Sequence, residues 1–272
     1  MCWIWFVYKN ISIKDSIFSR FFKSKTGKTR QKHVFFAFIL DFRPFSFYLI
    51  SFPEFRFPLH PKTHKMTEPD FSKIETAGCP AGDAGRDMIL RMNREHGPLR
   101  AWGFAHIPVG RSMLDVGCGA GAALRELAEL HPEAVLTGCD ISPLAVETAT
   151  ALNEALVKAG RMRFLLCGVP DLPFDDDVFD TVFSVESLYF WPDQTAGLRE
   201  IRRVLAPGGY FMTALEMVGG MMDERQLAIV EHLKMVCPTR EKLEDLMVSA
   251  GFDDVKVEFE PEHNWLCAAG RK

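Results

Sequence analysis

The 272-residue sequence lacks the cysteine patterns of a metal site or of a disulfide framework. Its seven cysteines include no Cys-x-x-Cys pair, and none stands at a metal-ligand spacing from the eight histidines. An odd number of cysteines cannot all pair within one chain. Because free cysteines persist in a reducing compartment, we predict a cytoplasmic protein without a metal site.

The sequence also lacks an apolar run long enough to cross a bilayer. The longest candidate, residues 34–52, is interrupted by two charged residues and a proline. Residues 1–8 are apolar, but no basic region precedes them and no cleavage site of small residues follows. We therefore expect no membrane partner, although a basic, aromatic arm that binds a membrane surface remains open.

Residues 1–65 are poor in small residues and in acidic charge. They contain one glycine and one alanine but 13 of the 23 phenylalanines, and their net charge is +9, against −13 for residues 66–272. The acidic larger part argues against a nucleic-acid partner. The apolar residues of 1–65 follow no sustained period. We expect this segment to be an extension that is disordered or not native, and 66–272 to form the domain.

The most informative stretch runs from Ser112 to Gly121. An apolar run typical of a buried strand leads into a Gly-x-Gly-x-Gly turn, and leucines and alanines at helical spacing follow from Ala122. Asp115 interrupts the apolar run, and a buried carboxylate needs a partner such as a bound cation or a backbone amide of the turn. No Lys-Ser or Lys-Thr follows the turn, which argues against a phosphate-binding P-loop.

A second strand is predicted over residues 134–140, and it also ends in an acid, Asp140. In a doubly wound sheet this acid lies at the carboxyl edge, where it can accept hydrogen bonds from the hydroxyls of a ribose. Ser142 and Pro143 then begin a helix, with serine as the cap and proline in the first turn. A helix-capping or solvent-facing role is the alternative for Asp140.

These motifs, with others that follow in order, resemble the class I S-adenosylmethionine-dependent methyltransferases, in particular a methyltransferase type 11-like domain. The matching segments are LDVGCGAG at 114–121, GCDISP at 138–143, DLPF at 171–174, VFD at 178–180, EIRRVLAPGG at 200–209, GF at 251–252 and NWLC at 264–267. The resemblance covers roughly residues 85–272. It implies an α/β fold, a Rossmann-like doubly wound seven-stranded sheet that is mostly parallel with the last strand antiparallel. We expect strands at 112–116, 135–140, 162–167, 179–185, 209–215, 253–259 and 263–269.

The resemblance implies S-adenosylmethionine as the cofactor and gives roles to residues that match the family pattern. Gly117 and Gly119 let the methionine part lie on the turn, Asp115 faces its ammonium group, and Asp140 holds the ribose hydroxyls. The other predicted cofactor-binding residues are Gly121, Ile141, Gly168, Val169 and Val185. At Gly168 the sequence departs from the family, which often has an acid there; Asp171 or water would replace it.

Residues that follow the fourth predicted strand are expected to face the methyl acceptor. The predicted substrate-binding residues are Glu186, Tyr189 and Trp191. A place in the core is an open alternative for the two aromatic residues, and helix capping is an alternative for Glu186. The sequence contains no Asn-Pro-Pro-Tyr or Asp-Pro-Pro-Tyr motif of enzymes that methylate base amino groups.

Three other features have two interpretations each. The aromatic segment 99–107 forms a lid over the site or packs under the sheet. Cys118, Cys139 and Cys167 follow three adjacent strands and form a soft-metal site or serve as small buried residues. The methionine-rich segment 216–238 covers the acceptor or belongs to the core.

We therefore predict an enzyme, a methyltransferase that transfers a methyl group to a small-molecule acceptor by in-line displacement. Such a reaction depends on alignment and on the exclusion of water. It needs no nucleophilic side chain, so we assign no catalytic residue; if the acceptor must lose a proton, Glu186 is the candidate base. The alternatives are a non-catalytic cofactor-binding protein with a partner-binding role, and a methyltransferase that acts on RNA or protein.

Overall fold

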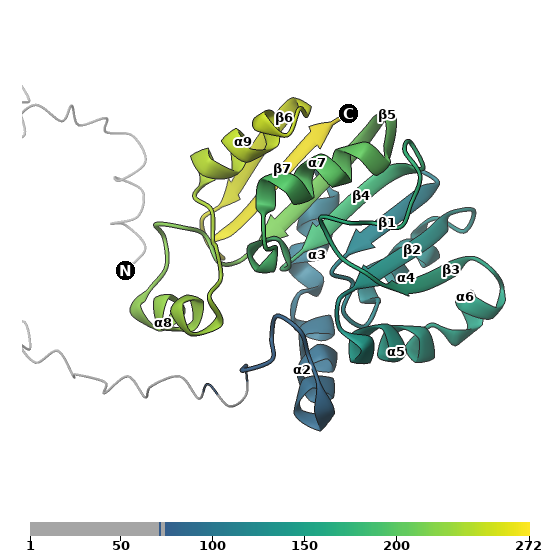
Figure 1. Ribbon diagram of the computed structural model, residues 1–272, viewed down its shortest axis with the longest axis horizontal. Helices are drawn as coiled ribbons and strands as arrows, with labels where there is room; N and C mark the ends of the chain where they lie inside the picture. Colours follow the sequence, from purple (N-terminus) through teal and green to yellow (C-terminus); the bar gives the residue numbers. More distant parts are fainter. Residues whose placement is uncertain (1–70, 72–73) are drawn as a thin grey trace, which may run out of the picture. The chain divides into compact units, whose positions relative to one another are not determined.

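Seven strands form one sheet in the computed structural model, which describes residue 71 and residues 74–272. The order across the sheet is β3-β2-β1-β4-β5-β7-β6 (Figure 1). Strands β1 to β5 pair in parallel, and β7 is antiparallel to both of its neighbours. The predicted fold class is confirmed. The strands are β1 (Ser112–Val116), β2 (Val135–Asp140), β3 (Met162–Leu166), β4 (Phe179–Val185), β5 (Leu205–Leu215), β6 (Asp253–Glu260) and β7 (Trp265–Arg271).

All seven predicted strands are present, and the largest difference concerns the start of β5. This strand begins at Leu205 rather than at residue 209, because Leu205 already pairs with Phe179 of β4 before the register shifts. The predictions for residues 1–65 lie outside the residues that the structure describes.

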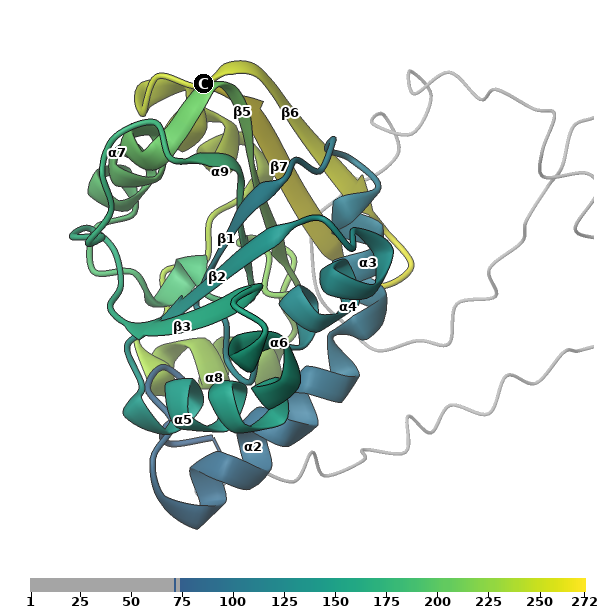
Figure 2. The ribbon, with the colours of Figure 1, turned by 90° about the vertical axis from the view of Figure 1, so that its right-hand side faces the viewer.

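The helices are arranged on the two faces of the sheet. They are α2 (Gly82–Glu95), α3 (Gly97–Phe104), α4 (Ala122–Leu130), α5 (Pro143–Leu152), α6 (Glu154–Lys158), α7 (Gln194–Val204), α8 (Glu224–Leu233) and α9 (Arg240–Ser249), with a short 3-10 helix, η3, at Leu188–Phe190. Figure 2 shows α3 and α4 on one side of the strands and α7 and α9 on the other. Within the described part of the chain, no helix is both long and apolar enough to cross a membrane.

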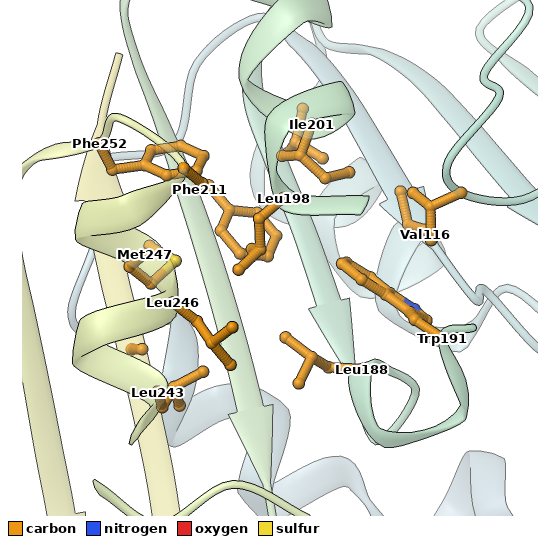
Figure 3. Packing of buried hydrophobic residues seen from close by; sticks show 14 of the residues in the cluster. Val116, Leu188, Trp191, Leu198, Ile201, Phe211, Leu243, Leu246, Met247 and Phe252 are labelled. Carbon is orange, nitrogen blue, oxygen red and sulfur yellow. The ribbon is translucent and has the colours of Figure 1, made fainter. Parts of the chain in front are cut away.

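Successive strand residues point to opposite faces, so each strand contributes to two apolar cores. Leu114 and Phe211 pack on the side of α7 and α9, whereas their neighbours Met113 and Met212 pack on the side of α3 and α4. Figure 3 shows the first core, in which side chains of α7 and α9 meet Phe211. Burying each large apolar side chain contributes about 1.5–3 kcal/mol, so these two layers fix the strand ends that carry the site.

The segment 99–107 packs against the sheet, as one of its two interpretations proposed. Gly97 and Pro98 end α2 but also begin α3, since proline suits the first turn of a helix. Phe104 of α3 contacts the ring of Phe183 edge-on, with 4.9 Å between the ring centroids. This packing places the junction between α2 and α3 at the carboxyl ends of the strands.

Candidate active site

A cavity of about 210 Å³ lies at the carboxyl ends of β1, β2 and β4, where the strand order reverses. Such a switch point is the usual ligand site of an open α/β sheet. Ten of the twelve predicted site residues line it: Asp115, Gly117, Gly119, Asp140, Ile141, Gly168, Val169, Val185, Glu186 and Trp191. Gly121 and Tyr189 are not part of its wall.

The carboxylate of Asp115 is buried at the base of this cavity. Asp115 is 3% exposed, and within the described part of the chain its side chain has no hydrogen-bond or ion-pair partner. Burial raises its pKa to about 8, while the nearby guanidinium of Arg100 opposes that rise and Asp140 adds to it. Arg100 itself is bound to Glu126, at 3.1 Å from Nε to Oε2. The site therefore holds a buried acid that is open to a cationic group.

Asp140 connects the glycine turn to the next strand. Its Oδ2 accepts a hydrogen bond from the backbone N–H of Gly119, and its Oδ1 accepts one from the N–H of Ser142, both at 2.9 Å. Burial raises the pKa of Asp140, and these backbone hydrogen bonds oppose the rise. The carboxylate lines the cavity while it fixes the shape of the turn.

Three glycines of the turn have positive φ, a conformation that favours glycine, but the space around them differs. A Cβ on Gly117 would lie 2.5 Å from Cβ and Oγ of Ser187. A Cβ on Gly119 would meet no atom within 4 Å. A Cβ on Gly121 would lie 2.7 Å from the ring of Phe164, a residue of β3 that packs against the turn. Gly121 thus allows close packing between the turn and β3.

A side chain at Gly168 would require the side chain of Ile141 to move. A Cβ at this position would lie 2.5 Å from Cγ2 of Ile141, whose side chain is exposed at the cavity. Val169 is buried and lines the same wall. Asp171 does not line the cavity, so the departure from the family pattern leaves an apolar surface here.

Glu186 is held in an unusual conformation at the end of β4. Its φ of 59° lies in the left-handed region, and its Oε1 accepts a 2.6 Å hydrogen bond from the backbone N–H of Glu216. The hydroxyl of Tyr189 donates to its Oε2. Burial, and secondarily the charge of Glu216, raise the pKa of Glu186 to about 8. Tyr189 is itself buried, so it positions Glu186 from the core instead of lining the cavity.

Trp191 belongs to the cavity wall and to the core at once. It is 7% exposed and packs in the cluster that contains Val116, Leu188 and Leu198 (Figure 3). Its indole N–H donates to Oγ of Ser187 at 3.3 Å. The two interpretations of this residue are therefore compatible.

The cavity wall includes residues that the sequence did not indicate, among them His96, Arg100, Ser187 and Phe190. His96 stands at the junction of α2 and α3, where burial and the nearby charge of Arg100 lower its pKa to about 4. It lies 90 residues from Glu186 in the sequence. The signal that would have found it is the helix break at Gly97, because a junction beside the sheet edge exposes its side chains to the site.

The cysteines and methionines behave mainly as apolar residues. Among the described residues, no group of three metal-ligating side chains includes a cysteine. Met235 is buried in the core, and no residue of 216–238 is among the described residues that line the cavity.

A Cβ on Gly219 would lie 2.6 Å from the carbonyl oxygen of Cys237, so this glycine permits close packing of two chain segments.

Comparisons with known proteins find methyltransferases among the similar sequences. A family model described as "Methyltransferase domain" matches residues 114–213. The O-methyltransferase rstn1 of Aspergillus nomiae is 35% identical over 146 residues, which are 53% of this chain. The match covers 64% of that relative, so this chain spans less than two thirds of its length.

Solved structures share the fold at low sequence identity. The geranyl diphosphate C-methyltransferase of Streptomyces coelicolor, in complex with Mg²⁺, geranyl-S-thiolodiphosphate and S-adenosyl-L-homocysteine, aligns with a TM-score of 0.58 and 14% identity. That alignment covers 65% of this chain and 76% of the other. The [4+2]-cyclase SpnF aligns with a TM-score of 0.54 and 19% identity, over 66% of this chain and 81% of the other. Proteins with different reactions therefore have this fold.

Proposed function

Because the chain belongs to the class I S-adenosylmethionine-dependent methyltransferases, we propose that it is an enzyme that transfers a methyl group from S-adenosylmethionine to a small-molecule acceptor. The observation that carries this proposal is the carboxylate of Asp115. A buried acid that lies beside a bare glycine turn, and has no partner among the described residues, suits the ammonium group of the cofactor, whose positive charge would offset the cost of burial.

The remaining wall of the cavity fits the other parts of the same cofactor. Gly117 and Gly119 line the cavity without side chains, so a ligand there would lie against the backbone of the turn. Asp140 keeps free acceptor capacity for the ribose hydroxyls after its two backbone hydrogen bonds, since a carboxylate offers about four lone-pair sites. The apolar surface of Ile141 and Val169 suits an adenine ring.

When bound, the cofactor supplies a methyl group activated by a sulfonium. The protein contributes alignment: the turn and the two acids hold the donor, and the apolar part of the wall around Trp191 and Phe190 limits the access of water to it. The aromatic side chains favour an acceptor with an apolar body. The name of rstn1 is consistent with an oxygen atom as the methyl acceptor.

Calorimetric titration with S-adenosylmethionine tests the cofactor site. We expect one binding event per chain, and Asp115→Asn should weaken it at least tenfold, because a charge-assisted contact contributes about 1.5–3 kcal/mol. Asp171→Asn is the matched control, since Asp171 lies outside the cavity wall. Equal affinity of the wild-type protein and Asp115→Asn would contradict the assignment of the ammonium site.

A further inference from the structure

We propose that His96, Glu186 and Glu216 form a binding site for one divalent first-row metal ion beside the cavity. The ligand atoms of these three side chains all lie within 4.8 Å of one another. The sequence predicted no metal site, because the three residues come from distant parts of the chain. Binding of the ion does not depend on the proposed function, whereas its role toward the acceptor rests on it.

Three elements bring the side chains together. His96 occupies the junction between α2 and α3, Glu186 follows β4, and Glu216 follows β5. Strands β4 and β5 are parallel neighbours, with Val185 paired to Ala214. Their carboxyl ends therefore place the two glutamates side by side, and the packing of α3 on the sheet sets the histidine against them.

Glu186 is oriented in the way that metal-binding carboxylates usually are. The hydroxyl of Tyr189 and the backbone N–H of Glu216 each donate to one of its oxygens, and each oxygen keeps a further lone pair. Hydrogen bonds of this kind fix the direction of ligating side chains. The left-handed backbone of Glu186 is strained for a residue other than glycine, and such strain is concentrated at functional sites.

Protein groups do not balance the two carboxylates. Within the described residues, no lysine or arginine forms an ion pair with Glu186 or Glu216. The arginine of the cavity wall, Arg100, is bound to Glu126 and to the carbonyl oxygen of Asn93. His263, whose charge acts to lower the pKa of Glu216, is hydrogen-bonded to Glu260. A bound cation would satisfy both acids.

The third ligand is available as well. The imidazole of His96 has no hydrogen-bond partner among the described residues, and it lines the cavity. One imidazole and two carboxylates suit Mn²⁺, Fe²⁺ or Zn²⁺ better than Ca²⁺ or Mg²⁺, which prefer oxygen ligands alone.

The spacing requires the ligand atoms to move closer when an ion binds. Two ligands at about 2.1 Å from a tetrahedral ion are about 3.4 Å apart, so atoms that lie up to 4.8 Å apart need to close by roughly 1 Å. Three protein ligands leave a coordination position open. We infer that this position takes an oxygen atom of the acceptor, and that Glu186 serves as a ligand of the ion and not as the base.

The test is a titration of the full chain, freed of metal with a chelator, by Mn²⁺. The free ion is measured by electron paramagnetic resonance. His96→Ala and Glu216→Gln should each lose one equivalent of bound Mn²⁺ or bind it at least about tenfold more weakly, since even an outer-shell partner contributes 10–100-fold. His106→Ala is the matched control, because His106 is exposed beyond the end of α3. It should bind as the wild-type protein does.

Equal Mn²⁺ binding by the wild-type protein, His96→Ala and Glu216→Gln would overturn the proposal. Circular dichroism of each variant establishes that it is folded. Titration of the same metal-free proteins with S-adenosylhomocysteine separates the two hypotheses. If S-adenosylhomocysteine binds while the wild-type protein and the two variants bind metal equally, the metal site is wrong and the proposed cofactor site stands.

Discussion

The backbone N–H of Gly119 donates a 2.9 Å hydrogen bond to Oδ2 of Asp140. The acid that ends β2 therefore fixes the glycine turn that follows β1, in addition to lining the cavity. Under the proposed function, this relationship would give Asp140 two contributions to cofactor binding. One would be direct, through the ribose hydroxyls, and the other would act through the shape of the turn.

Replacement of Asp140 should weaken cofactor binding by tenfold or more. Asp140→Ala removes charge-assisted hydrogen bonds that contribute about 1.5–3 kcal/mol, and it leaves the N–H groups of Gly119 and Ser142 without acceptors. Asp140→Asn keeps one acceptor oxygen and should have an intermediate affinity. Calorimetry with S-adenosylhomocysteine measures both. An unchanged affinity in Asp140→Ala would refute the ribose assignment.

Cofactor binding should release a proton near pH 7. Asp115 has a pKa of about 8 in the ligand-free protein, so its carboxyl group is mainly protonated at pH 7. A bound ammonium group favours the ionised form and lowers this pKa. Affinity should then fall as the pH drops below 8, by up to about tenfold per pH unit. Calorimetry in buffers of different ionisation enthalpy measures the proton; no release would contradict the assignment.

The carboxyl group of Asp115 should also make the stability of the ligand-free protein depend on pH. The folded state keeps the proton of Asp115 up to a pKa of about 8, whereas an unfolded aspartic acid loses it near the ordinary value of 3.8. The folded state binds more protons in this window, so the free energy of unfolding should fall as the pH rises from about 4 to 8. Asp115→Asn should flatten that slope in denaturant titrations.

Gly117→Ala should abolish cofactor binding and also lower stability. The sequence alone suggested only that a side chain would block the ligand. The structure adds that a Cβ would lie 2.5 Å from Ser187, at a φ of +80°. We expect a loss of about 1–3 kcal/mol in the free energy of unfolding. Ser187→Gly in the same chain should recover part of the stability but not the binding. A stable Gly117→Ala protein with normal affinity would be the contrary result.

Removal of residues 1–65 should leave the domain functional. This prediction rests on composition, because these residues carry charge opposite to the rest and precede the whole family pattern. A chain that begins at Met66 should bind the cofactor with the same affinity and melt within a few degrees of the full chain. Aggregation of the shortened chain, or loss of binding, would show that the segment contributes to the domain.

The sequence predicted the strands and the two acids because their signals are local. An apolar run that contains Asp115 next to its last residue, or that ends in Asp140, is followed by a turn and a helix, and this order determines which edge of the sheet each acid occupies. The placement of Tyr189 and His96 depends instead on packing between distant elements. Nothing near Tyr189 in the sequence indicates that its hydroxyl reaches back to Glu186. The helix break at Gly97 marks a junction at His96, but it does not indicate that the packing of α3 sets this residue beside β4 and β5.

The most direct test of methyl transfer to a small molecule is mass spectrometry of a metabolite extract incubated with the protein and methyl-labelled S-adenosylmethionine. We predict a labelled small-molecule product, formed together with an equal amount of S-adenosylhomocysteine and absent with Asp115→Asn. Cofactor binding without any labelled small molecule, or label recovered only in protein or RNA, would contradict the account.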